Sequence, residues 1–97
     1  MSIIRTWKWE VSEKEKWGEA ISKFGRTVSQ FEGRDFTVLW PTTGPANVRI
    51  VAITFDNWAS VDVWNEWQET EAGKKVIGEL SGTGKVVDRK SYEVLDL

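Results

Sequence analysis

Hydrophobic residues recur along the chain with two different periods, and these periods predict strands and helices. Strand-like segments, rich in β-branched and aromatic residues, lie at 3–11, 36–40, 48–55 and 86–95. Apolar residues recur at steps of three and four over 13–31 and again over 61–80, which predicts two amphipathic helical regions, the second with a weak point at 70–73. The predicted order is strand, helix, strand, strand, helix, strand.

This order is the split βαβ arrangement of a ferredoxin-like α+β fold, with four antiparallel strands and two helices on one face. A chain of 97 residues suits a single domain, 1–97. Polar motifs mark the helix ends. Ser12 with Glu15 forms a capping box at the first helix, Ser60 is the expected cap of the second, and Gly33 is expected to end the first helix in the left-handed conformation.

Both faces of the predicted sheet carry apolar side chains. The third strand alternates between Val48, Ile50 and Ala52 on one face and Val51, Ile53 and Phe55 on the other. Two helices cover only one face, which leaves an apolar patch larger than a monomer normally exposes. We therefore predict a homodimer in which two sheets pack face to face about 10 Å apart. The alternative is a monomer whose short central strand is apolar on both sides.

Composition excludes several classes of chemistry. The chain has no cysteine and no histidine, so disulfides, thiolate or histidine metal sites, Ser-His-Asp catalysis and His-ligated haem cannot be built from it alone. Its net charge of −2 offers no attraction for nucleic acid. No segment approaches 18 apolar residues and the N-terminus lacks a secretory signal. We expect a cytoplasmic protein with no cofactor, metal, membrane or nucleic-acid partner.

The run from Ile53 to Trp67 reads as a strand, an aromatic residue, a Ser cap and a helix with an inward residue. With the topology, it resembles the dimeric α+β-barrel superfamily, and within it the small proteins related to antibiotic biosynthesis monooxygenases. Trp58, Ser60 and Val63 match the family pattern, whereas Trp67 stands where the family has a histidine, so haem degradation is not expected. The resemblance implies the fold and a dimer with a pocket between sheet and helices, and it does not by itself imply oxygenase activity. As a hypothesis for the activity we take a cofactor-free oxygenase, isomerase or cyclase.

Seven tryptophans in so short a chain suggest a pocket for a flat ligand. We predict that a hydrophobic or aromatic small molecule binds in a cleft walled by Trp7, Trp9, Trp40, Trp64 and Trp67, with Tyr92 as a hydroxyl donor. Core filling and dimer packing explain the same residues without a ligand. Trp64 and Trp67, at helical spacing, are core candidates first.

Arg5 is the candidate catalytic residue. It shares the apolar face of the first strand with Trp7 and Trp9, where a guanidinium needs a partner. That partner is either a substrate carboxylate or enolate, whose developing charge Arg5 would stabilise, or an internal ion pair or water at a strand end. The rival function is a non-enzymatic structural or interaction protein of the same fold. An enclosed void of about 300 Å³ or more beside Arg5 favours ligand binding, and a solid interior favours the rival.

Overall fold

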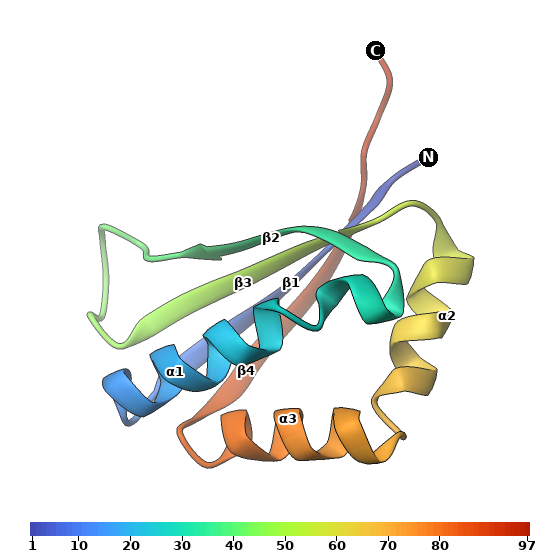
Figure 1. Cartoon of the computed structure of the whole chain (residues 1–97). Coiled ribbons are helices and arrows are strands. Elements are labelled where there is room, and N and C mark those ends of the chain that lie inside the picture. The colour runs from blue at the N-terminus through green and yellow to red at the C-terminus, as the bar shows by residue number, and fades with distance from the viewer.

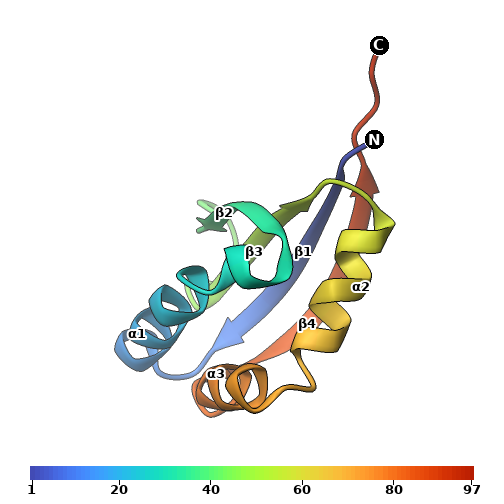
Figure 2. The same cartoon turned by 45° about the vertical axis from the view of Figure 1, so that its right-hand side comes forward.

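A computed structural model describes all 97 residues (Figure 1). The elements are β1 (Ile3–Val11), α1 (Lys14–Gly25), the 3₁₀ turn η1 (Val28–Phe31), β2 (Gly33–Leu39), β3 (Val48–Phe55), α2 (Trp58–Trp67), α3 (Glu71–Ser81) and β4 (Gly84–Glu93). The strands form one antiparallel sheet in the order β2-β3-β1-β4, and the helices lie on one side of it (Figures 1 and 2). The ferredoxin-like α+β fold is confirmed, with three helices instead of two. No helix combines the length and hydropathy that a membrane crossing requires.

The residues that cap α1 and α2 differ from those that the sequence motifs predicted. The Ser12 hydroxyl donates to the carbonyl oxygen of Thr83 at 3.0 Å, and no side chain caps α1. This bond ties the end of β1 to the start of β4, so a tertiary acceptor displaces the local capping box. The prediction of Ser60 as a cap is also wrong. Asn57 caps α2, because its side-chain oxygen accepts from the backbone N–H of Ser60 at 3.0 Å.

Each predicted helical region is divided in two. The first stops at Gly25, and its last turn, Val28–Phe31, is a separate 3₁₀ turn. Glu32, and not Gly33, takes the left-handed conformation, with φ of 61°. Gly33 instead opens β2, where a Cβ would lie within 3.0 Å of the side chains of η1 and β3. The weak point predicted at 70–73 is the boundary of α2 and α3, where Thr70 accepts from the Gly73 N–H at 3.1 Å.

Aromatic side chains fill the core between the sheet and the helices. Phe31 is fully buried, with ring centres 4.7 Å from Trp64, 4.9 Å from Trp67 and 6.3 Å from Phe55. Phe24 of α1 packs on the same ring at 5.9 Å. These contacts join α1, η1, α2 and β3, so the hydrophobic positions that the helical periods selected do form the core.

The side of the sheet that faces away from the helices is hereafter the open face. It carries Leu39 from β2, Val48, Ile50 and Ala52 from β3, Ile4, Thr6 and Lys8 from β1, and Asp88, Lys90 and Tyr92 from β4. Six of these ten side chains are apolar or aromatic, and of the six only Val48 is buried within the chain. No helix lies over this face (Figure 2). The prediction that the sheet is apolar on both faces is therefore confirmed.

A bulge in β4 changes the direction in which its side chains point. Val86 pairs with Trp9 and Arg89 pairs with Trp7, so three steps along β4 match two steps along β1. Uninterrupted alternation from Val86 would direct Asp88 to the helices and Arg89 to the open face. The extra residue reverses this assignment, and Arg89 faces the helices.

Candidate functional site

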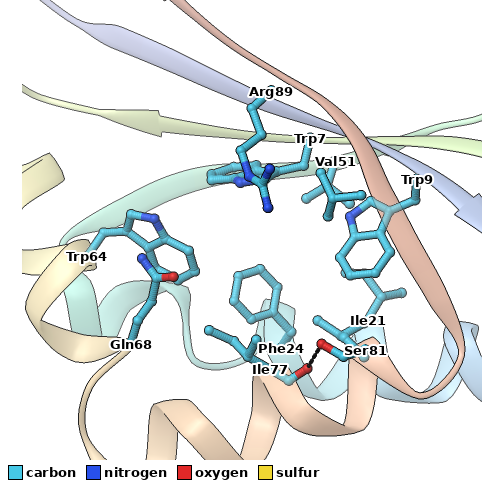
Figure 3. Close-up of a pocket in the computed structure, with 12 residues that line it drawn as sticks. Trp7, Trp9, Ile21, Phe24, Val51, Trp64, Gln68, Ile77, Ser81 and Arg89 are labelled. Atoms are coloured by element: carbon cyan, nitrogen blue, oxygen red, sulfur yellow. Dashed lines mark hydrogen bonds between the residues drawn. The ribbon is translucent and has the colours of Figure 1, made fainter.

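A cleft of about 150 Å³ lies between the sheet and the helices (Figure 3). The sheet contributes Trp7, Trp9 and Val51, and the helices contribute Phe24 and Trp64 among other apolar side chains. The Trp7 and Trp64 rings meet edge to face with centres 5.7 Å apart, and Trp64 meets Phe24 in the same way at 5.8 Å. A cleft of this size and shape accommodates a single aromatic ring.

Polar groups enter the cleft from two sides. Figure 3 shows the Arg89 guanidinium reaching down from β4 beside Trp7, and the Gln68 amide beside Trp64. Ser81 also borders the cleft, but its hydroxyl already donates to the Ile77 carbonyl oxygen at 3.0 Å. Arg89 is therefore the only charged side chain that lines this apolar cleft.

Arg89 and Arg5 form a region of uncompensated positive charge. None of the ion pairs in the structure includes either residue. The Arg5 guanidinium lies over the Trp7 ring, 5.7 Å from its centre, a cation–π contact. Burial first, and the nearby charge of Arg89 second, lower the pKa of Arg5. The Arg5 guanidinium nevertheless remains charged at neutral pH, because an arginine is not deprotonated in proteins.

The structure places three of the predicted ligand-binding residues in the cleft lining, and a fourth, Trp67, stacks on Trp64 from the core with ring centres 5.9 Å apart. Trp7, Trp9 and Trp64 line the cleft. Arg5 does not line it, and the alternative that gave Arg5 an internal ion pair is wrong, because Trp7 is its neighbour instead. Trp67 is buried in the core, where its indole N–H donates to the Gln30 side-chain oxygen at 3.3 Å.

Trp40 and Tyr92 lie elsewhere. Trp40 is 63% exposed in the β2–β3 connection, where the Arg49 guanidinium lies 4.8 Å from its ring centre. Arg49 also donates to the carbonyl oxygens of Ala46 and Val48, so this arginine holds the connection together. Tyr92 is on the open face, 49% exposed, and its neighbour across the strands is Ile4.

Arg89 and Gln68 are the cleft residues that sequence reasoning missed. Gln68 directly follows α2, in the interruption between the two helices. Arg89 lies beyond the bulge, where simple alternation assigns it to the wrong face. The signal in the sequence is the adjacent pair Val86 and Val87. Two neighbouring apolar residues in an edge strand interrupt the alternation of apolar and polar positions, as a bulge does.

The cleft is neither the enclosed void of about 300 Å³ that favours ligand binding nor the solid interior that favours the non-enzymatic function. It has half of the roughly 300 Å³ expected for a drug-sized ligand, and Arg89 borders it where Arg5 was expected. The interior is also not solid, because the cleft is open between three tryptophans and an unpaired cation. Its geometry suits a one-ring ligand, or one ring of a larger ligand that protrudes.

No protein-family model and no curated protein matches the sequence. Solved structures do match its fold at low identity. SnoaB, a cofactor-independent oxygenase from Streptomyces nogalater, matches with a TM-score of 0.79 and 6% identity over 99% of this chain and 95% of SnoaB. A candidate antibiotic biosynthesis monooxygenase from Caulobacter crescentus matches with a TM-score of 0.73 and 12% identity over 98% of this chain and 92% of that protein.

A dimeric ferredoxin-like protein from an uncultured marine organism matches with a TM-score of 0.71 and 11% identity, over 99% of this chain and 98% of that protein. At such identities the matches establish the fold alone. The resemblance predicted from the sequence is confirmed at that level. The chain has the fold of the dimeric ferredoxin-like proteins that resemble antibiotic biosynthesis monooxygenases.

Proposed function

We propose that this chain is a homodimer that binds a small aromatic molecule with a negatively charged oxygen in the cleft between sheet and helices. The observation that carries the proposal is the unpaired guanidinium of Arg89 in an otherwise apolar, aromatic cleft. The edges and faces of the Trp7, Trp64 and Phe24 rings suit a flat ligand. A guanidinium suits each of these anions. Its N–H groups donate to both oxygens of a carboxylate, or to the single charged oxygen of a phenolate or enolate.

The positive charge behind the cleft favours an anion more strongly than one arginine would. Arg5 and Arg89 repel each other, and an anion between or beside them relieves that repulsion. The same potential lowers the pKa of a bound phenol or enol and so favours its electron-rich anion. Stabilising this anion is the chemistry that the site offers without a cofactor.

This chemistry fits more than one of the reactions in the hypothesis from the sequence. An enolate or phenolate is the reactive form in isomerisation and cyclisation, and it is the electron donor when dioxygen is the co-substrate. SnoaB is described as a cofactor-independent oxygenase, which agrees with the last of these. In this proposal Arg89 contacts the anion and Arg5 strengthens the field from behind Trp7.

The dimer in this proposal rests on the open face. Leu39, Ile50 and Ala52 are apolar and uncovered there, and one protein with the same fold is described as dimeric. Packing two open faces together removes this apolar surface from water. Sedimentation at micromolar concentration is expected to show twice the chain mass of 11.1 kDa, and a single-chain particle would contradict the dimer.

A non-enzymatic interaction protein is the second candidate function. The observation in its favour is the small volume of the cleft, about 150 Å³, together with the structural roles of Trp67 and Trp40. In that function the tryptophans fill the core and stabilise the β2–β3 hairpin. The cleft then binds charged and uncharged aromatic probes equally weakly.

Benzoate is expected to bind at least about tenfold more tightly than benzamide, which has the same shape without the charge. The readout is an NMR titration that follows the indole N–H signals of Trp7, Trp9 and Trp64. The affinity for benzoate is expected to stay constant between about pH 6 and pH 8, because the chain has no histidine or cysteine to titrate there and its arginines stay charged. A phenolic probe instead gains affinity as the pH approaches the probe's own pKa.

Two results would count against ligand binding. Equal affinities for benzoate and benzamide would remove the role of Arg89 as an anion partner. Signals that move only for Trp40 and Trp58, both exposed, would show that the probes bind the surface and not the cleft.

A further inference from the structure

The last four residues, 94–97, carry apolar side chains that their own chain does not cover. Leu95 is 68% exposed and Leu97 is fully exposed. The Val94 N–H donates to the Ser2 carbonyl oxygen at 2.9 Å, and residues 95–97 form no further backbone hydrogen bond. Figure 1 shows this segment running past the end of the sheet, away from the body of the chain. Burial of these two leucines against another apolar surface would be favourable.

The open face contains a groove of about 440 Å³ that is empty in a single chain. Its apolar lining is Leu39, Pro41, Pro45, Val48 and Ile50, from β2, β3 and the connection between them. Lys8 and Lys90 stand at its other side. Lys90 pairs with Asp88 at 3.7 Å, whereas Lys8 takes part in no ion pair. Thr6, Thr43, Asp88 and Tyr92 complete the lining. The groove therefore has an apolar side and a polar side, and Lys8 is the one charged lining residue without an ion pair.

We propose that residues 94–97 of one protomer lie in this groove of the partner. The inference rests on the homodimer of the proposed function, and it names the segment that completes the interface. In an extended segment Leu95 and Leu97 point to one side and Asp96 to the other. The leucines meet the apolar lining, and Asp96 lies at the rim within reach of the flexible Lys8 side chain.

The groove extends from Tyr92 to the hairpin end of the sheet, and the segment cannot reach that hairpin end in its own chain. Glu93 pairs with Ile3, at the end of the sheet that is opposite the β2–β3 connection (Figure 1). Lys8 lies five positions further along β1, about 17 Å away. Four extended residues span about 13 Å and would first have to reverse direction. In the proposed dimer the twofold axis runs across the strands, so the end of one sheet lies over the hairpin end of the other and the segment reaches the partner's groove.

A cross-linking experiment tests this arrangement directly. Because the chain has no cysteine, Lys8→Cys and Leu97→Cys each introduce a single thiol. A tagged Lys8→Cys chain is mixed with an untagged Leu97→Cys chain, left to exchange protomers and oxidised. A disulfide needs the two Cα atoms within about 7 Å, so the covalent heterodimer forms only if the segment reaches the partner's groove.

The matched control pairs Leu97→Cys with Lys75→Cys, an exposed lysine of α3 on the helix side of the sheet. We expect at least about tenfold more heterodimer from the Lys8 pair than from this control, because the dimer raises the effective concentration of the two thiols. Equal yields from a protein that sediments as a dimer would overturn the placement of the segment and leave the dimer intact. A protein that sediments as a monomer would overturn both.

Deleting residues 95–97 provides a second measurement. The fold is expected to persist, because these residues lie outside the sheet and form no backbone hydrogen bond. The dimer dissociation constant is expected to rise by at least about tenfold, since two leucines lose their burial. Affinity for benzoate is expected to stay within about twofold, because the cleft lies on the other face of the sheet. An unchanged dimer dissociation constant would overturn the inference.

Discussion

Replacing Phe31 with alanine is expected to lower the free energy of unfolding by about 3–5 kcal/mol. The Phe31 ring is fully buried and contacts Trp64 and Trp67 of α2, Phe55 of β3 and Phe24 of α1, so it joins η1 to three other elements. Removing the ring leaves a cavity that these rigid aromatic neighbours cannot fill by small adjustments. The loss is a large part of the 5–15 kcal/mol by which domains are typically stable, and urea denaturation followed by circular dichroism measures it.

Trp58→Ala is the matched control for this experiment. Trp58 is also aromatic and is larger, but it is half exposed at the start of α2. Its removal is expected to change the unfolding free energy by less than about 1 kcal/mol. Similar losses from the two substitutions would show that η1 is not the packing centre that joins helices to sheet.

Arg89→Gln is expected to weaken benzoate binding by about 10- to 100-fold, while benzamide binding changes by less than about twofold. The glutamine keeps a donor and most of the side-chain length, so the difference isolates the charge. The loss is expected because the guanidinium of this exposed residue borders an apolar cleft and no carboxylate pairs with it. NMR titration of the indole signals with both probes measures the two affinities.

Arg26→Gln makes the same chemical change at an exposed arginine beyond the end of α1 that forms no ion pair. It is expected to leave both affinities unchanged within about twofold, because an exposed distant charge is screened by solvent and salt. Equal losses from Arg26→Gln and Arg89→Gln would show that net charge, and not the cleft, attracts the anion.

Arg5→Gln distinguishes the two arginines. We expect a loss smaller than that of Arg89→Gln, because Arg5 lies behind Trp7 and acts only through its field. A larger loss would make Arg5 the residue that contacts the anion, as the sequence suggested. Because Arg5 contributes a cation–π contact to the fold, the free energy of unfolding of the Arg5→Gln variant is measured together with its benzoate affinity.

The order of strands and helices, the inward faces of the helices and the apolar character of both sheet faces follow from the sequence alone. Hydrophobic periodicity is a local property, because the geometry of a strand or helix determines which neighbours along the chain share a face. The core positions of Trp17, Phe24, Trp64 and Phe31 were predictable for that reason. The absence of cysteine and histidine likewise determines which chemistry the chain can support.

Helix ends were less predictable, since caps depend on which acceptor is nearest in space. The Ser12 hydroxyl has a local motif in the sequence, yet it donates to Thr83, 71 positions away. Gly33 has the conformational freedom to end a helix, but close packing against η1 and β3 assigns it to a strand. In both cases a tertiary neighbour outweighs the local preference.

The residues that form the cleft were the least predictable. Sheet order and helix packing decide which tryptophans meet. They place Trp7, Trp9 and Trp64 at the cleft and Trp67 in the core against Trp64, whereas Trp40 and Tyr92 lie elsewhere. Arg89 depends on a single extra residue in β4, because one added position turns every later side chain of the strand to the opposite face. Local patterning thus specifies the elements and their buried faces, whereas pairing register, which arises only when strands meet, selects the charged group that enters the cleft.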